Sequence, residues 1–254
     1  MPFTISHAVL APPLSKLTGH RLPIGALAIG CMLPDLYRLF TQENSNTTHL
    51  WSSLIHPDLW IGLAFCLLWY AIYRPALYRF IGIQHELNLN GFVSILKFTF
   101  AICLALLIGI ATHLIWDGLT HADFRTFAFK DALSQDIALF GQSYPLHRIL
   151  QIGTSFAALP IMFWMCWHYY QKFQQHYPVH ARIKGFAWGL ALISFGAGAL
   201  QTGYFLQSPS SLMWRSELYE IVGRSLNEFF QGSLLMFSLG CILFLILDRG
   251  HRMG

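Results

Sequence analysis

The sequence contains few charged residues. Asp, Glu, Lys and Arg make up 11% of its 254 residues, whereas soluble domains carry about 25%. Hydrophobic residues make up 55%. A soluble chain of this length needs many more solvated side chains to cover its surface. The shortage of charge therefore argues against a soluble domain and favours a chain whose surface faces lipid.

Several features that mark other protein classes are also missing. The net charge is +4, but Lys and Arg are scattered between apolar runs and form no basic stripe, so nucleic acid is not an expected partner. The five cysteines are dispersed singly, which argues against a zinc ribbon or a disulfide framework. A glycine-rich phosphate loop, a G-x-S-x-G motif and the cysteine spacing of heme or iron–sulfur proteins are absent. Metal-assisted hydrolysis is the enzymatic chemistry that the residue types allow.

Long apolar runs dominate the chain. At about 1.5 Å per residue, five of them are long enough to cross a hydrocarbon core of about 30 Å as helices. Isolated strands would leave backbone groups unpaired in lipid. The expected spans are 58–74, 94–117, 149–170, 185–206 and 227–247. We predict an all-α fold, an integral membrane helical bundle with five or six transmembrane helices, forming a single polytopic domain over residues 1–254.

The first 40 residues are expected to form a helical hairpin or half-helices. Residues 22–33 are apolar but number only about a dozen, so they form a re-entrant or buried half-helix, or part of a sixth span. If they span, ten Lys and Arg fall on the side of both termini and six on the other, which places the termini in the cytoplasm. If they are re-entrant, the count is eight to eight.

The most specific polar pattern is THLIWDGLTH at 112–121. His113, Asp117 and His121 recur every four residues, so on a continuous helix they lie along one stripe that drifts about 40° per step. Imidazole and carboxylate are ligands that zinc prefers, and leaving them unpaired at membrane depth is costly. The pattern predicts a metal or catalytic site. The alternative is that His113 and Asp117 pair with each other or with backbone carbonyls and only stabilise the helix end.

Other polar residues fall at the same membrane face. Asp35 follows the 22–33 segment, His49 lies in the next connector, and His147 closes the connector 118–148. Gln151 lies one turn after His147, from where it can hydrogen-bond within the bundle or across the site.

Five ordered motifs carry a resemblance to a known family: MPFTISHAVLAPPL, GALAIGCMLPD, THLWSSL, GIATHLIWDGLTH and LHRILQ. They resemble the bacterial membrane-protein family catalogued as domain of unknown function 4184, over nearly the whole chain. More distantly, the Ser-His start, the Pro-Asp pair and the His-x-x-x-Asp helix are similar to YdjM-like inner-membrane proteins, described as candidate metal-dependent hydrolases. Those proteins in turn resemble the all-helical zinc phospholipase C and P1 nuclease group.

The resemblance implies a set of metal ligands: His7, Asp35, His49, His113, Asp117 and His121. The soluble enzymes also bind metal through a mature N-terminal amine. In this sequence Met1 stands six residues before His7, which argues against a complete trinuclear site. The resemblance also implies a multi-pass protein of the bacterial inner (cytoplasmic) membrane. With the termini in the cytoplasm, the candidate site faces the periplasm.

Three functions are compatible with these features. The first is a zinc-dependent hydrolase of a lipid or lipid-linked phosphoester, with Asp35 and Asp117 as catalytic residues. Its expected substrate-binding residues are Arg125, His147, Arg148 and Gln151. The second is a transporter or an ion or proton pathway. The third is a non-enzymatic membrane scaffold with a structural metal or polar cluster. Membrane lipids are the expected partners in each case.

Overall fold

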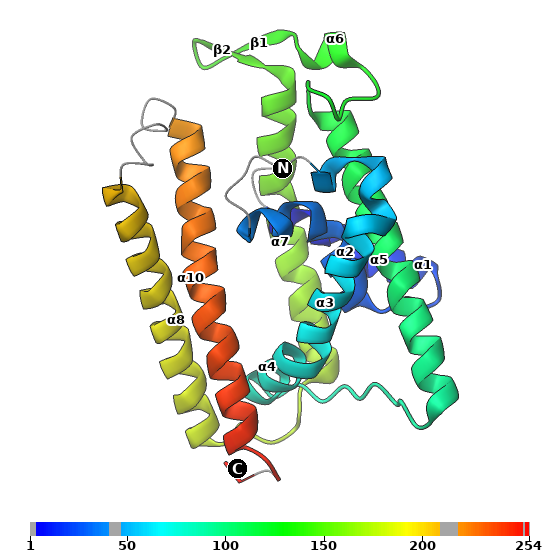
Figure 1. Ribbon diagram of the computed structural model, residues 1–254, viewed down its shortest axis with the longest axis vertical. Coiled ribbons are helices and arrows are strands. Elements are labelled where there is room, and N and C mark those ends of the chain that lie inside the picture. Colours follow the sequence, from blue (N-terminus) through cyan, green and yellow to red (C-terminus); the bar gives the residue numbers. More distant parts are fainter. Residues whose placement is uncertain (1–3, 41–46, 209–217, 251, 254) are drawn as a thin grey trace. The chain divides into compact units, whose positions relative to one another are not determined.

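The computed structural model describes residues 4–40, 47–208, 218–250 and 252–253, and these residues are helical apart from loops and one short hairpin (Figure 1). The predicted all-α class is therefore confirmed. The short N-terminal elements are η1 (Thr4–Leu10), α1 (Ala11–Leu17), α2 (Ile24–Leu36), η2 (Tyr37–Leu39) and η3 (Thr47–His49). A kinked helical run follows as η4 (Trp51–Ser53), η5 (Leu54–Leu59), α3 (Trp60–Leu68), η6 (Trp69–Tyr73) and α4 (Arg74–Ile81). The later helices are α5 (Phe92–Thr120), α6 (Lys130–Leu133), α7 (Leu146–Phe173), α8 (Ala181–Gln207) and α10 (Leu218–Leu247).

Five helical stretches of the described chain are long and apolar enough to cross a membrane. They are Trp51–Ile81, Phe92–Thr120, Leu146–Phe173, Ala181–Gln207 and Ile221–Leu247. Each contains one of the five spans expected from the sequence. Helix α2 has 13 residues, or about 20 Å at 1.5 Å per residue, which is shorter than the hydrocarbon core.

The described chain divides into two compact units. The first unit holds residues 4–37, 47–66 and 87–169, and the second holds 38–40, 67–86, 170–208, 218–250 and 252–253.

The first unit is organised around the crossing of α2 and α5. A Cβ on Gly30 would lie 2.6 Å from the carbonyl oxygen of Leu106, and a Cβ on Gly109 would lie 2.7 Å from the backbone nitrogen of Cys31. The two helices therefore approach backbone to backbone, which small residues permit in membrane bundles. On one side of the crossing, Leu33, Ile110 and Leu114 form a buried hydrophobic cluster. Leu54, Ile61 and Phe65 pack against this cluster.

The second unit pairs α8 with α10 in an antiparallel arrangement along their length (Figure 1). Its core contains Phe80, Ile183 and Phe244. Near one end, the Arg79 guanidinium forms two hydrogen bonds with the Asp248 carboxylate, at 2.9 and 3.3 Å.

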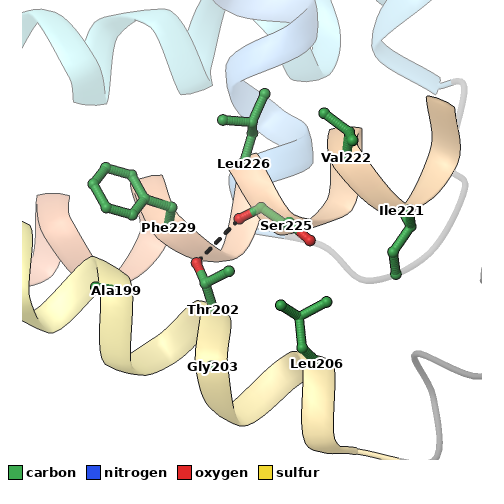
Figure 2. A pocket seen from close by; sticks show the side chains of 9 residues that line it. All are labelled: Ala199, Thr202, Gly203, Leu206, Ile221, Val222, Ser225, Leu226 and Phe229. Atoms are coloured by element: carbon green, nitrogen blue, oxygen red, sulfur yellow. Dashed lines mark hydrogen bonds between the residues drawn. The ribbon is translucent and has the colours of Figure 1, made fainter. Parts of the chain in front are cut away.

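An apolar cavity of about 620 Å³ lies between α8 and α10 (Figure 2). Its lining residues lie between Ala199 and Leu206 on α8 and between Ile221 and Phe229 on α10. A hydrogen bond of 3.2 Å from the Thr202 hydroxyl to the Ser225 carbonyl crosses between the two helices.

The connector between α5 and α7 contains helix α6 and a two-stranded hairpin, β1 (Asp136–Leu139) and β2 (Gln142–Pro145). The strands are antiparallel, and Leu139 pairs with Gln142 across a two-residue turn. Both turn residues, Phe140 and Gly141, have positive φ angles of 52° and 80°, the geometry that such hairpin turns require. The sequence alone did not predict this hairpin.

Candidate metal centre

Five polar side chains from four elements of the first unit gather in one place. His113 and Asp117 come from α5, Asp35 from the end of α2, His7 from η1 and His49 from η3. The Asp35 side chain is 12% exposed, and the other four are exposed by 2% or less. The cluster is therefore almost closed to solvent.

The crossing of α2 and α5 orients the central histidine. Gly109 lies one turn before His113, and Gly30 directly precedes Cys31, so the close contact brings the Cys31 carbonyl to His113. Nδ1 of His113 donates to this carbonyl at 2.8 Å. Because a carbonyl only accepts, Nδ1 carries the hydrogen, so the neutral form of the ring can offer the Nε2 lone pair to a cation in the cluster. A backbone carbonyl is a frequent outer partner of a metal-binding histidine.

The remaining ring and carboxylate atoms lie within a few ångströms of one another. His113 Nε2 is 3.5 Å from Asp117 Oδ2, and His49 Nε2 is 3.8 Å from the same oxygen. His49 Nε2 is also 3.3 Å from Asp35 Oδ1, while His7 Nε2 is 4.0 Å from Asp35 Oδ2. The His7 ring stacks on the His113 ring with centroids 3.9 Å apart.

These spacings fit a cation with short bonds to nitrogen and oxygen. With bonds of about 2.0–2.1 Å, two ligand atoms of a tetrahedral zinc site lie about 3.4 Å apart. Two groups of three residues have ligand atoms close enough to share an ion: His7, Asp35 and His113, and His49, His113 and Asp117. Both groups use His113, which has a single nitrogen left for a metal. They are therefore two ways of building one site around this residue.

Three buried ligand atoms have no hydrogen-bond partner within the described residues. They are Nε2 of His7, Nε2 of His113 and Oδ2 of Asp35. Buried polar atoms are nearly always satisfied in folded proteins, and binding to a metal ion is one way in which such atoms are satisfied without a hydrogen bond. Burial also lowers the pKa of His7 well below its usual range, and His113 adds to this effect. A neutral imidazole is the form that binds a cation.

His121 lies beside the cluster and not within either group of three. Helix α5 ends at Thr120, and His121 has extended φ and ψ angles of −115° and 154°, so the expected helical stripe stops after Asp117. Nδ1 of His121 is 3.1 Å from the Asp117 carbonyl oxygen and 3.5 Å from Asp117 Oδ1. Burial lowers the pKa of His121 to about 4, against the effect of the Asp117 carboxylate.

Arg125 joins the cluster to the connector. Its Nη1 donates to Asp117 Oδ2 at 3.0 Å, and its Nε donates to both oxygens of Asp123 at 3.0 and 3.1 Å. Although burial opposes ionisation of Asp123, the hydrogen bonds and charge of Arg125 hold its pKa at about 2. Arg125 therefore places a partly buried positive charge at one edge of the site.

The other expected substrate-binding residues lie along the start of α7. Gln151 is buried, and its Nε2 donates to the Thr120 carbonyl at 2.8 Å, next to His121. Nδ1 of His147 is 3.1 Å from the Leu133 carbonyl in the connector, and Arg148 is exposed. Of this group, Gln151 and Arg125 have contacts at the end of α5.

Asp58 is a buried acidic residue that the sequence reasoning missed. It is 0% exposed, and the Ser53 hydroxyl donates to its Oδ2 at 2.7 Å. Its Oδ1 has no hydrogen-bond partner within the described residues. The segment that carries it, η5, packs on α5. The available signal was a second Pro-Asp pair, Pro57-Asp58, which repeats Pro34-Asp35 but precedes an apolar run and so resembled the first residue of a span.

The fold and the cluster define a class: a multi-pass helical membrane protein with buried histidines and carboxylates that could hold a metal ion. The chain belongs to the family described as Domain of unknown function (DUF4184), which matches residues 1–247. The family assignment drawn from the five motifs is therefore confirmed. No curated protein and no solved structure matches the chain.

Proposed function

We propose that this protein is a membrane-embedded, zinc-dependent hydrolase that cleaves a lipid or lipid-linked phosphoester. The observation that carries the proposal is the buried cluster around His113, where imidazole nitrogens and carboxylate oxygens lie at spacings that suit one cation. The distant resemblance to YdjM-like proteins and to the zinc phospholipase C and P1 nuclease group points to the same chemistry.

In this proposal His113, His49 and Asp117 hold the cation, with His7 and Asp35 on its other side. A zinc ion bound there would lower the pKa of a coordinated water and polarise a phosphoryl oxygen. Asp35 has the most exposed side chain of the five, at 12%. It is therefore the carboxylate best placed to accept a proton from a water that enters the cluster.

Arg125 would hold the anionic phosphate group. Its guanidinium already lies between the Asp117 and Asp123 carboxylates, and a planar guanidinium can bind two phosphate oxygens at once. His113 lies seven residues before the end of α5, or about 10 Å along the helix axis. This depth suits a substrate whose phosphate lies at the head-group level. We further propose that the membrane is a bacterial inner membrane and that the site opens to the periplasm.

A non-enzymatic role is the second candidate, and the ion pair between Arg125 and Asp117 favours it. A guanidinium 3.0 Å from Asp117 Oδ2 already compensates the buried carboxylate. In that case the cluster would hold α2, α5 and the N-terminal segments together and would catalyse no reaction.

Metal analysis and a phosphoester assay separate the two candidates. The wild type, His113→Ala and Asp117→Asn are purified in detergent and compared with His168→Ala, which removes an exposed histidine of α7. We expect zinc to copurify with the wild type and the control and to be lost from the two cluster variants. Cleavage of a panel of phospholipids and polyprenyl diphosphates, measured by chromatography of the lipid products, should follow the zinc content.

Two results would contradict the proposal. Equal zinc content in all four proteins would show that the cluster around His113 does not bind the zinc. Bound zinc without cleavage of any panel substrate, together with a collapse of thermal stability on chelation, would favour the structural role.

A further inference from the structure

The connector between α5 and α7 exposes large apolar side chains outside the candidate spans. Phe124, Phe129 and Phe140 are exposed by 51%, 72% and 103%. Ile137 and Leu139 of strand β1 are exposed by 37% and 36%. Single exposed apolar residues are ordinary, but several of them within one short segment mark a surface that contacts something other than water.

The hairpin that carries Phe140 is tied to the start of α7. Strand β2 continues directly into α7, and the backbone nitrogen of Leu146 donates to the Gln135 carbonyl at 2.8 Å, which closes the base of the hairpin. Leu133, just before the hairpin, is 3% exposed, and its carbonyl contacts His147 Nδ1 at 3.1 Å. The exposed side chains are therefore presented from an anchored scaffold.

The turn itself does not explain the phenylalanine at its tip. Phe140 has a φ of 52°, and two-residue turns of this kind favour Asn, Asp or Gly at that position. Phe129 also has a positive φ, of 61°. Both exposed aromatic residues thus occupy backbone positions that suit other residue types better. The backbone conformation therefore does not account for an aromatic side chain at either position.

Both ends of the connector are ends of membrane spans. Helix α5 ends at Thr120 and α7 begins at Leu146, each three residues outside the span expected from the sequence (94–117 and 149–170). The connector therefore starts and finishes within about 5 Å of the expected hydrocarbon edge. A four-residue strand is only about 13 Å long, and Figure 1 shows the hairpin lying across the end of α7 and not continuing along its axis. The tip therefore stays close to the head-group region.

We propose that the connector docks on the bilayer surface, with Phe140 and Phe129 inserted at the boundary between head groups and acyl chains. Aromatic rings are enriched at this depth in membrane proteins. The bilayer is favoured over a soluble partner because the spans at both ends already hold the connector against it. Docking would also keep Arg125, which belongs to the same connector and approaches the Phe124 ring, at the level of lipid phosphates.

Site-directed fluorescence in vesicles tests this docking without using metal binding or hydrolysis. In a background with the five cysteines replaced, Phe140→Cys is labelled with the environment-sensitive dye NBD and reconstituted into phosphatidylethanolamine/phosphatidylglycerol vesicles. The matched control is Asp131→Cys, an exposed charged position of α6 in the same connector. Circular dichroism and size-exclusion profiles check that both proteins fold like the wild type.

At position 140 we expect blue-shifted emission, quenching by spin-labelled lipids, and a several-fold smaller quenching constant for aqueous iodide than at position 131. Equal iodide quenching at the two positions would overturn the proposal. Protection from iodide without quenching by spin-labelled lipids would also overturn it, because another protein surface would then cover the tip. Neither readout depends on phosphoester cleavage, so failure of the docking and failure of the proposed hydrolase are distinguishable.

Discussion

Replacing Gly109 by alanine tests the α2–α5 crossing and the candidate metal centre together. The added Cβ would lie 2.7 Å from the Leu27 carbonyl oxygen and from the Cys31 nitrogen, whereas ordinary contact begins at 3.4 Å. These are backbone atoms, which cannot rotate away as a side chain can. Helix α2 must therefore move back by about 0.7 Å, a shift of the kind that overpacking forces.

The shift has two consequences of predictable size. Overpacking costs about 1–3 kcal/mol, and the higher helix propensity of alanine offsets up to about 1 kcal/mol of this. If α2 moves away along the line that joins His113 Nδ1 to the Cys31 carbonyl oxygen, this 2.8 Å contact lengthens to about 3.5 Å. That distance is beyond the usual hydrogen-bond range. Loss of such an outer partner lowers metal affinity by about 10–100-fold.

Competition with a zinc-binding dye measures the affinity, and thermal unfolding in detergent measures stability. The control is Gly196→Ala on α8, where a Cβ would meet no atom within 4 Å. We expect the control to bind zinc like the wild type and to be at least as stable, because alanine gains up to about 1 kcal/mol of helix propensity there too. Gly109→Ala should be weaker than the wild type in both assays. A Gly109→Ala protein that binds zinc and unfolds like the wild type would refute both the close crossing and the orienting role of the Cys31 carbonyl.

Two further predictions concern stability. Arg79→Ala removes both hydrogen bonds to the Asp248 carboxylate, whose side chain is only 7% exposed, so thermal unfolding should show a loss of about 1–3 kcal/mol; an unchanged unfolding temperature would show that water replaces the guanidinium. Chelation of zinc should destabilise the wild type, because a ligand at 100 times its Kd contributes about 2.7 kcal/mol. Asp117→Asn should not respond to the chelator, and an equal response would place the zinc elsewhere.

The spans were predictable because each apolar run must by itself be long enough to cross the hydrocarbon core. Each expected span lies inside a candidate membrane helix. Four of the five helices extend further at both ends, as at Phe92 and Thr120 of α5, and the last extends further only at its start, since it ends at Leu247 as expected. Polar residues can continue a helix outside the hydrocarbon, so hydropathy alone does not mark its ends. The hairpin was missed because its turn residues are Phe140 and Gly141, without the Asn-Gly or Asp-Gly pair that signals a hairpin.

The candidate site was predictable only in part. The spacing of His113 and Asp117 is local and visible in the sequence. The contact between His113 and the Cys31 carbonyl joins residues 82 positions apart, and it depends on a glycine crossing that no local pattern reveals. Because α5 ends at Thr120, His121 also does not lie on the helical stripe that was expected to contain it. Asp58 remained hidden because an acidic residue at the start of an apolar run has the same pattern whether it faces head groups or a buried cluster.

The balance of charge around Asp117 favours a bound cation over a purely structural network. Arg125 pairs with the carboxylates of Asp117 and Asp123, whereas Asp35 lies beside the imidazoles of His7 and His49. The Asp123 side chain is 38% exposed and reaches solvent. Among the described residues, the two buried carboxylates therefore face one permanently positive side chain, Arg125, whenever the imidazoles are neutral. Uncompensated charge is expensive at the edge of a bilayer. A divalent cation bound at His113 would neutralise the excess and engage the buried atoms that lack partners, whereas Arg125 alone can do neither.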